Sequence, residues 1–390
     1  MTPELPLPPI NGLRLQVGHL AQELAVRHEV CVLGYRWPEQ EADGAGAFEL
    51  RSLAAPSRAL PVRALDWLGA AVQNQPAAVG PFTGHAEHEV ARLVSERRFD
   101  VAHVTSPVMA RLKHSLGSVP SILAALDAWH LNLLASAAIG PRITRPLRRL
   151  EARRARRFES RALGWYERVV MVTAEDAAAV HKLNPSLPLE VIPNGVDASR
   201  FAPAAVPLAE RGHIVFTGAL AYPPNVAAAH FLALRILPRV RRKVADAHLT
   251  IVGRSPCRTV RALASPGVVD VVADVPEVRP WLQRAEVYAC PMISGTGIKN
   301  KLLEALACGS PAVATALSCQ GMSVRSEEQL LIADGEERFA EAVVRLMDDP
   351  ALRARLAASA RKYVLQDHNW PEVARSYERI YSEVIDAATG

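Results

Sequence analysis

The chain has 390 residues, of which 49% are hydrophobic and 22% charged, and its formal net charge at pH 7 is +5. This length predicts two domains or more, each large enough to bury a core, and the composition is typical of a globular protein. Only 5% of the residues are aromatic, which argues against recognition of single-stranded nucleic acid by base stacking.

The cysteines are scattered, odd in number and without C-x-x-C spacing: Cys31, Cys257, Cys290, Cys308 and Cys319. We therefore expect neither structural disulfides nor a zinc site, and a reducing cytoplasm fits this pattern. The N-terminus is proline-rich rather than basic and then apolar, so it has no visible secretory signal. The longest apolar window, 121–140, is interrupted by Asp127, His130 and Asn132, which argues against a membrane span.

Short apolar strands alternate with helical patterns along most of the chain. We expect a first set of strands at 29–34, 101–104, 121–125 and 169–173. Prolines at 193, 203 and 207 separate it from a second set, expected at 214–218, 249–253, 268–272, 286–292 and 312–315, with helices at 226–244 and 278–285. Beyond Arg338 the pattern is helical to the end.

This alternation predicts an α/β fold of two doubly wound, Rossmann-like domains with parallel sheets that face a cleft. We place the first domain at 1–195, the second at 196–368, and a C-terminal helix at 369–390 that packs back toward the first.

The segment from Arg142 to Arg161 is an arginine-dense helical pattern, RITRPLRRLEARRARRFESR. It has three interpretations: a solvated helix face, a surface that docks on an anionic membrane, or a site for an anionic acceptor.

Glycine turns follow three strands of the second set, at Gly218, Gly253 and Ser294-Gly-Thr-Gly297. Each lets the backbone approach a ligand closely. The first strand of the chain is not followed by G-x-G-x-x-G, which disfavours a dinucleotide-dependent dehydrogenase.

The most informative stretch is residues 291–315, PMISGTGIKNKLLEALACGSPAVAT, which reads as a strand end, a glycine turn, a helix and the next strand. The helix is expected from about Asn300 to Cys308, and the free N–H groups near Gly297, together with the helix dipole, form a potential binding site for phosphate. Lys301 and Glu304 are three residues apart and share a helical face, while Lys299 lies at the turn. A cation for phosphate and a carboxylate for sugar hydroxyls suit a nucleotide sugar; the alternative is an ordinary turn with solvated lysines.

Over nearly its whole length the chain resembles the retaining glycosyltransferases of family 4, which have the GT-B architecture. The motifs that carry the resemblance are PLPPING at 6–12, HEV at 28–30, VIPNGVD at 191–197 with Phe201, FTGALAYPPN at 216–225, AHLTIVGR at 247–254 and the segment from Gly295 to Gly309.

The resemblance implies a donor site in the second domain and an acceptor site in the first. It assigns Glu304 to the ribose hydroxyls, Lys299 and Lys301 to phosphate, Gly12 to the donor diphosphate, and the backbone at 273–275, including Val275, to the base. Gly218 and Gly297 give the backbone close access, and Arg254 is placed for a phosphate or base edge, or for solvent. No obligatory metal or cofactor is implied, because the leaving diphosphate accepts the proton of the acceptor.

The chain departs from the family pattern at three places. Thr296 stands where many members carry a first glutamate, so Ser294 or Thr296 would contact the sugar by its hydroxyl. Ala219 and Asn225 stand where an arginine and a lysine are common, and we infer that Lys299 and Lys301 supply that charge.

The third departure concerns a His-Asp pair that many members have, which here reads Leu126-Asp127. Asp127 is our first candidate for contact with the donor sugar and His130 our second. The alternative for His130 is that it caps or packs a helix.

Relatives usually have an apolar strand before the proline-rich loop, whereas this chain begins Met1-Thr-Pro-Glu. Either the first sheet is incomplete or the true start lies upstream, and we predict the latter.

We expect a cytoplasmic retaining glycosyltransferase that moves a hexosyl unit from a nucleoside-diphosphate sugar to a hydroxyl of a glycan, a lipid-linked acceptor or a natural product. We expect no nucleic-acid partner, and peripheral contact with the membrane's inner face through Arg142 to Arg161 is an open alternative. The rivals are a catalytically silent protein that binds nucleotide sugars and a nucleotide-sugar epimerase.

Overall fold

The computed structural model describes residues 1–8, 11–37, 46–56, 69–70, 73, 75–82, 84–139, 142–206 and 208–390. Within the loop expected at 6–12, residues 9 and 10 lie outside this set, and so does the side chain of Arg142. The chain divides into two compact units, Met1–Asn194 with Trp370–Gly390, and Gly195–Asn369. We call them the first and the second domain.

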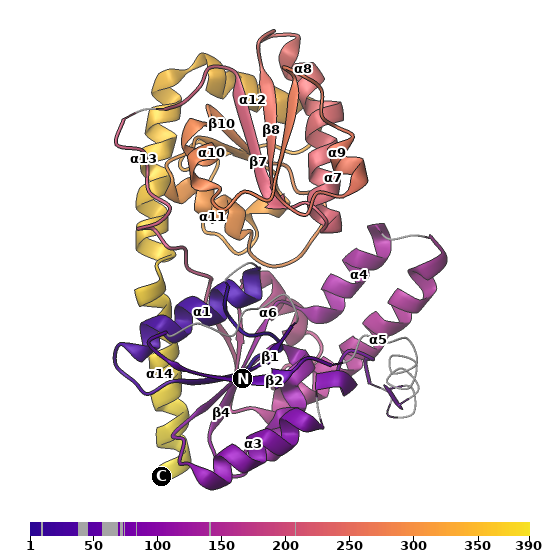
Figure 1. Ribbon diagram of the computed structural model, residues 1–390, viewed down its shortest axis with the longest axis vertical. Helices are drawn as coiled ribbons and strands as arrows, with labels where there is room; N and C mark the ends of the chain where they lie inside the picture. The colour runs from indigo at the N-terminus through magenta and orange to yellow at the C-terminus, as the bar shows by residue number, and fades with distance from the viewer. Residues whose placement is uncertain are drawn as a thin grey trace. The chain divides into compact units, whose positions relative to one another are not determined.

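The second domain is built on a six-stranded parallel sheet with helices on both of its faces (Figure 1). The strand order is β12-β11-β10-β7-β8-β9. The strands are β7 (His213–Ala219), β8 (His248–Arg254), β9 (Val269–Ala273), β10 (Val287–Cys290), β11 (Ala312–Ala314) and β12 (Leu331–Ile332). The helices are α7 (Pro223–Phe231), α8 (Leu237–Arg241), α9 (Arg258–Arg261), α10 (Arg279–Arg284), α11 (Asn300–Ala307), α12 (Glu336–Asp348) and α13 (Pro350–Asp367).

The central strands of this sheet read as continuous apolar runs because both of their faces are covered. Ile214, Val215 and Phe216 of β7 are at most 1% exposed, and Ile251 and Val252 of β8 are fully buried. The five strands expected from these runs are present with small shifts of their ends, whereas the two-residue strand β12 was not foreseen.

The helix expected at 226–244 is interrupted. It divides into α7, a π-helical turn over Leu232–Ile236, and α8, which has Pro238 at its start. Proline has no N–H to continue the hydrogen-bond ladder, so the chain widens locally before the next turn.

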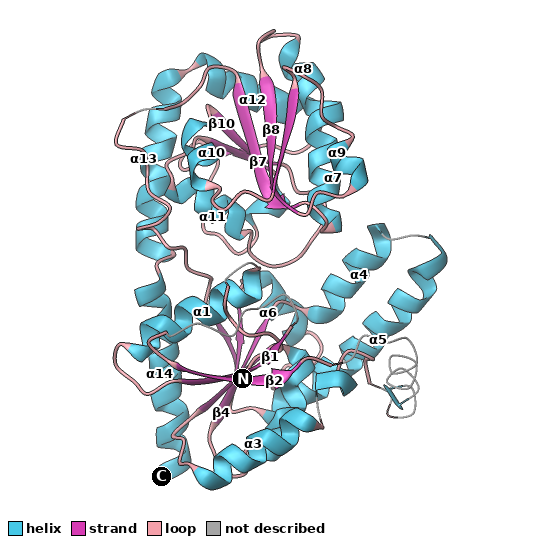
Figure 2. Ribbon diagram, in the orientation of Figure 1, coloured by secondary structure: helices cyan, strands magenta, loops and turns pink. Residues whose placement is uncertain are grey.

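The first domain contains β1 (Cys31–Arg36), paired in parallel with β2 (Glu49–Ala54), and a four-stranded parallel sheet. That sheet has the order β3 (Ala102–Thr105), β4 (Ser121–Leu126), β5 (Arg168–Met171) and β6 (Leu189–Val191). Its helices are α1 (Gly12–Ala25), α3 (His85–Glu96), α4 (Trp129–Ile139), α5 (Arg145–Ala162), α6 (Ala174–His181) and α14 (Trp370–Thr389). Both domains are therefore α/β units with parallel sheets, as the sequence predicts (Figure 2).

The sheet of the first domain is interrupted between β1 and β3. Residues 1–5 run along the gap: the Thr2 N–H donates to Leu33 O at 3.0 Å, and the Thr105 N–H donates to Met1 O at 2.8 Å. Beside them lies a cavity of about 870 Å³, lined by residues of β1, β3, α1 and α14 that include Leu24, Val32 and Ala102.

The C-terminal helix α14 belongs to the first domain and packs along α1 (Figure 1). Tyr377 and Ile380 are fully buried, and the Arg27 guanidinium is 2.9 Å from the Glu378 carboxylate. Among the helices that the structure describes, none combines the length and apolar character required to cross a membrane.

Candidate functional site

Two of the glycine turns meet at one edge of the second domain's sheet. Gly218 is the last residue but one of β7 and pairs in register with Gly253 of β8, and β10 pairs with the other side of β7. A Cβ atom on Gly253 would overlap the Gly218 carbonyl oxygen, so no larger residue fits there. The carboxyl ends of parallel strands are where open α/β sheets bind ligands, and here backbone rather than side chain lines that edge.

The loop after β10 has a rigid base and a turn that only glycine adopts easily. The Ser318 hydroxyl donates to Cys290 O at 2.5 Å, and the Thr315 hydroxyl donates to Met292 O at 2.7 Å. Gly295 and Gly297 then have φ angles of 111° and 68°, which lie in the left-handed region. This fixes the position of Ser294 and Thr296 and leads the chain into α11.

Lys299 and Lys301 differ in what they contact, although both precede Glu304. The Lys299 side chain is buried, and its ammonium donates to the carbonyls of Thr296 at 3.1 Å and Gly297 at 2.5 Å. Lys299 therefore holds the glycine turn closed. Its sequence-based assignment to a phosphate competes with these bonds.

Lys301 instead extends across to the turn after β7. Its ammonium donates to the Asn225 Oδ1 atom and lies 5.1 Å from the centre of the Phe216 ring. A Cβ atom on Gly218 would come within 3.3 Å of the same nitrogen. Burial lowers the pKa of Lys301 to about 8, with the Lys299 charge acting in the same direction.

Glu304 lies one helical turn after Lys301, and its carboxylate differs from the two lysines in its contacts. Among the described residues this side chain has no hydrogen bond or ion pair. Burial raises the pKa of Glu304 to about 7, while the charges of Lys301 and Arg200 act in the opposite direction. A partly buried carboxylate without a hydrogen-bond partner is costly, and hydroxyl donors from a ligand would satisfy it.

The segment expected to hold a base lies next to Gly253. The Asp274 N–H donates to Gly253 O at 2.9 Å, and the Asp274 carboxylate accepts from the Ser255 N–H at 2.7 Å. Asp274 and Ser255 both have positive φ angles, of 52° and 50°. Arg254 is the last residue of β8, and Val275 packs against the core of the domain. Because Asp274 is bonded to Gly253 and Val275 is packed, the backbone at 273–275 is held beside the glycine turns.

The remaining predicted residues belong to the first domain. Gly12 is exposed and begins α1, where the Asn11 side chain accepts from the Arg14 N–H. Asp127 follows the end of β4, and its Oδ2 atom accepts from the Asn132 amide at 3.2 Å. The preceding residue, Leu126, has a φ of 70°, a conformation that is costly for a branched side chain and that often marks a functional position.

His130 is buried and bound to a carboxylate of its own domain. Its Nδ1 atom is 2.8 Å from Glu159 Oε2, and the N–H groups of Trp129 and His130 also donate to Glu159, at 2.9 and 3.0 Å. Glu159 is fully buried on α5 and so caps the N-terminus of α4. This geometry favours the packing interpretation of His130 over contact with a substrate.

Sequence reasoning missed the role of one residue that organises these sites and missed another altogether. Asn225 anchors Lys301 and also donates to Ala219 O at 3.0 Å, whereas the sequence identified it only as a departure from the family pattern. Glu159 lies 29 positions from His130, inside the arginine-dense pattern, where its signal is hidden.

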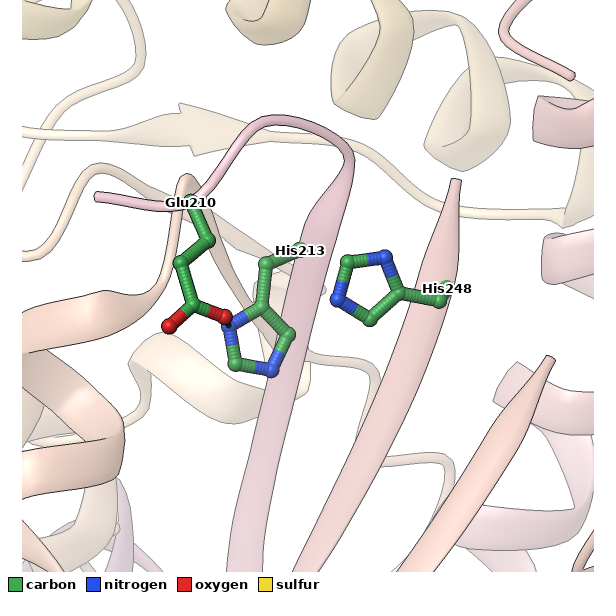
Figure 3. A group of neighbouring side chains, drawn as sticks. All are labelled: Glu210, His213 and His248. Carbon is green, nitrogen blue, oxygen red and sulfur yellow. Dashed lines mark ion pairs between the residues drawn. The ribbon is translucent and has the colours of Figure 1, made fainter. Parts of the chain in front are cut away.

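Within the described residues, one group offers three possible metal ligands: Glu210, His213 and His248 (Figure 3). The histidines begin β7 and β8, at the sheet edge opposite the glycine turns. Their rings are stacked with centroids 4.7 Å apart and planes only 11° apart, so the in-plane lone pairs do not converge on one ion. His213 Nε2 is also 2.8 Å from Thr250 Oγ1. We assign no metal to this group.

Two family models match the chain, one in each domain. The model described as glycosyltransferase family 4 matches residues 10–200, and the model described as glycosyl transferases group 1 matches residues 211–349.

The chain is 31% identical over 229 residues to a D-inositol 3-phosphate glycosyltransferase of Salinispora arenicola, covering 51% of this chain and 50% of that protein. It is also 31% identical over 215 residues to a GDP-mannose-dependent alpha-(1-6)-phosphatidylinositol monomannoside mannosyltransferase of Mycobacterium tuberculosis, covering 49% of this chain and 54% of that protein. The chain thus spans about half the length of these curated relatives. The structure of a sucrose-phosphate synthase from Thermosynechococcus elongatus has the same fold, with a TM-score of 0.73 and 18% identity over 97% of this chain and 94% of the other.

Proposed function

Because the chain belongs to the family 4-like glycosyltransferases of GT-B architecture, we propose that it transfers a hexosyl unit from a nucleoside-diphosphate sugar to a hydroxyl acceptor. The proposal includes retention of the anomeric configuration, a cytoplasmic location, and peripheral contact with an anionic membrane through Arg142 to Arg161.

One observation carries the proposal: beside two glycine turns, α11 holds a partly desolvated cation and a carboxylate that makes no hydrogen bond or ion pair with any residue that the structure describes. Lys301 lies against the turn at Gly218, and Glu304 follows one helical turn later. Lys299 closes the loop at Gly297, so we assign the phosphate to Lys301 alone. A nucleoside diphosphate offers the matching groups, an anion for Lys301 and ribose hydroxyls for Glu304.

In this mechanism Lys301 stabilises the negative charge that grows on the leaving diphosphate. The N–H groups at the start of α11 act in the same direction, because the side chain of the N-cap residue, Lys299, does not cap that helix. Ser294 and Thr296 supply hydroxyls for the sugar, and the backbone at 273–275 with Arg254 takes the base. The rate gain comes from positioning and from electrostatics that strengthen in the transition state.

The first domain contributes Gly12 at the diphosphate and Asp127 at the transferred sugar. The strained backbone at Leu126 supports the choice of Asp127, because such strain holds a side chain in a set direction. We retain His130 only as the packing partner of Glu159.

The relatives support two details of the substrates. The Mycobacterium tuberculosis relative is named as dependent on GDP-mannose, which supports a nucleoside-diphosphate sugar as donor. The relatives are named for inositol phosphate and phosphatidylinositol acceptors, which supports an acceptor hydroxyl on a polyol or a lipid-linked glycan.

A silent nucleotide-sugar-binding protein is the second candidate, favoured by Thr296 in the place of a glutamate and by the bond that ties His130 to Glu159. A panel of nucleoside diphosphates and their sugars in thermal-shift assays, followed by donor hydrolysis, separates the two. A ligand at a hundred times its dissociation constant adds about 2.7 kcal/mol of stability. Binding with hydrolysis supports the transferase, whereas binding without hydrolysis or transfer supports the silent protein. Absence of any shift would contradict both. A sugar product of inverted configuration at a ring carbon other than the anomeric one, formed without acceptor, would indicate an epimerase.

A further inference from the structure

The exposed face of α5 carries arginines that have no acidic partner in the part of the chain that the structure describes. Arg149, Arg153, Arg156 and Arg157 are all exposed, and their spacing places them on one side of the helix. No ion pair involves any of them among the described residues. Several arginines on other helices are paired, such as Arg92 of α3, which lies 2.5 Å from Glu89 and 2.8 Å from Glu96.

The two carboxylates of α5 are both used elsewhere. Glu159 is buried against His130, while Glu151 pairs with Arg154 at 2.8 Å and accepts from the Ala77 N–H at 2.9 Å. Like charges at i,i+4 on a helix destabilise it, so the uncompensated arginine face has a cost in the free protein. An anionic partner would remove that cost.

Apolar side chains lie beside this face at the beginning of α5. Ile143, just before the helix, is 90% exposed, Leu147 is 47% exposed and Leu150 is 39% exposed. α4 and α5 pack along each other, and the pair projects from the rest of the first domain (Figure 1). On α4, Leu134 is 44% exposed.

Farther along α5, the arginines border a hollow. Arg153, Arg156 and Arg157 line a depression of about 460 Å³ together with Ser160 and with Lys182 at the end of α6. Its lining is cationic, so it suits a phosphate group.

From this combination we propose that the α4–α5 pair is a docking surface for an anionic lipid bilayer. Ile143, Leu147 and Leu150 enter the interfacial region, and the arginine face binds lipid phosphates. Nucleic acid would match the charge but not the exposed apolar residues. The surface extends the proposed function by bringing the enzyme to a lipid-linked acceptor, yet membrane binding itself requires neither donor nor acceptor.

The test is flotation of the full-length protein with phosphatidylcholine vesicles that contain or lack phosphatidylglycerol. The charge variant combines four substitutions: Arg149→Gln, Arg153→Gln, Arg156→Gln and Arg157→Gln. Its matched control removes the same charge from exposed arginines elsewhere: Arg98→Gln, Arg211→Gln, Arg242→Gln and Arg325→Gln. We expect wild type and control to float with the anionic vesicles, and the charge variant to bind them roughly a hundredfold more weakly or worse.

A second variant, Ile143→Ser with Leu147→Ser, keeps every charge. We expect it to bind at low salt but to dissociate at a salt concentration where wild type stays bound, because salt screens only the electrostatic part. Unchanged melting temperatures and unchanged hydrolysis of a soluble donor would show that the variants are folded. If wild type itself does not hydrolyse the donor, that result counts against the proposed glycosyltransferase function and leaves the membrane-docking proposal untouched.

The docking proposal is overturned if wild type does not bind anionic vesicles, or if the charge variant binds them as tightly as wild type does. It is also overturned if the control variant loses as much vesicle affinity as the charge variant. If vesicle binding of the serine variant depends on salt concentration as that of wild type does, the apolar residues do not insert into the bilayer. If wild type binds duplex DNA more tightly than vesicles and the charge variant does not bind DNA, the partner of this surface is nucleic acid rather than a membrane.

Discussion

The candidate residues of the two domains differ in how far the fold already occupies their polar groups. In the second domain, the Glu304 carboxylate has no partner among the described residues, and burial lowers the pKa of Lys301 to about 8. In the first domain, the Glu159 carboxylate is bonded to both the ring and the backbone N–H of His130, and the Asn132 amide donates to the Asp127 carboxylate. One site retains groups that a ligand would satisfy, whereas the other has largely satisfied its own.

This difference suggests a division of work. Charged groups that are desolvated without an ion-pair partner are suited to bind a ligand and to respond electrostatically, and strongly shifted pKa values gather at functional sites for that reason. Groups tied into hydrogen bonds are suited to fix geometry. We therefore expect substitutions of Glu304 and Lys301 to change binding and rate, and substitutions of Glu159 and His130 to change stability.

The largest effect should come from Glu159→Ala. The substitution leaves the His130 ring and two N–H groups of α4 buried without their acceptor, and such losses cost about 3 kcal/mol or more. Urea denaturation measures the loss in free energy of unfolding. Glu175→Ala, at an exposed position of α6, is the control and should change stability little. Equal stability of the two variants would contradict the structural role of Glu159.

Lys301→Met should lower turnover more than any other single change in the second domain. Removing one preorganised group that stabilises developing charge typically costs about a hundredfold or more in rate. The stability of the variant should change little, because the loss of the hydrogen bond to Asn225 is offset by the removal of a partly desolvated charge. Transfer or donor hydrolysis under saturating donor measures the rate, with the exposed Lys243→Met as control. A rate within twofold of wild type would remove Lys301 from the mechanism.

The fold was largely predictable because parallel strands covered on both faces leave long apolar runs. Strands β7, β8 and β10 lie within a few residues of their expected positions. Strands β2 and β6 were missed because they are only partly buried, and their side chains give no continuous apolar signal.

The site was predictable only as a set of residue types. The sequence identifies Lys299 and Lys301 as neighbours, but which carbonyls surround Lys299 depends on the φ angles of Gly295 and Gly297. The contact of Lys301 with Asn225 joins residues 76 positions apart. Such pairings arise from the register of strands and the path of loops, which single-residue patterns do not encode.

Glu304→Ala should weaken the binding of a nucleoside diphosphate. The carboxylate is assigned to ribose hydroxyls, and a hydrogen bond to a charged group contributes about 1.5–3 kcal/mol. Calorimetric titration measures the affinity, and Glu341→Ala at an exposed position of α12 is the control. Affinity equal to that of wild type would refute the ribose assignment.

The smallest effect should be a pH dependence of stability in the ligand-free protein. The pKa of Glu304 is raised from 4.5 to about 7, so the folded state holds a proton that the unfolded state has released between these values. Stability therefore falls as pH rises through this window, by about 1 kcal/mol once partial exposure is allowed for. Lys301 acts in the other direction: its pKa falls from 10.5 to about 8, so stability recovers as pH rises from 8 to 10.5.

Glu304→Gln should remove the decline between pH 4.5 and 7, and Lys301→Met the recovery at higher pH. Each is measured as the difference from wild type in the free energy of unfolding along the pH series, so that other titrating groups cancel. A Glu304→Gln curve parallel to that of wild type would mean that the carboxylate is already satisfied within the fold. The contrast between the two domains would then disappear, since the fold would occupy Glu304 as fully as it occupies His130.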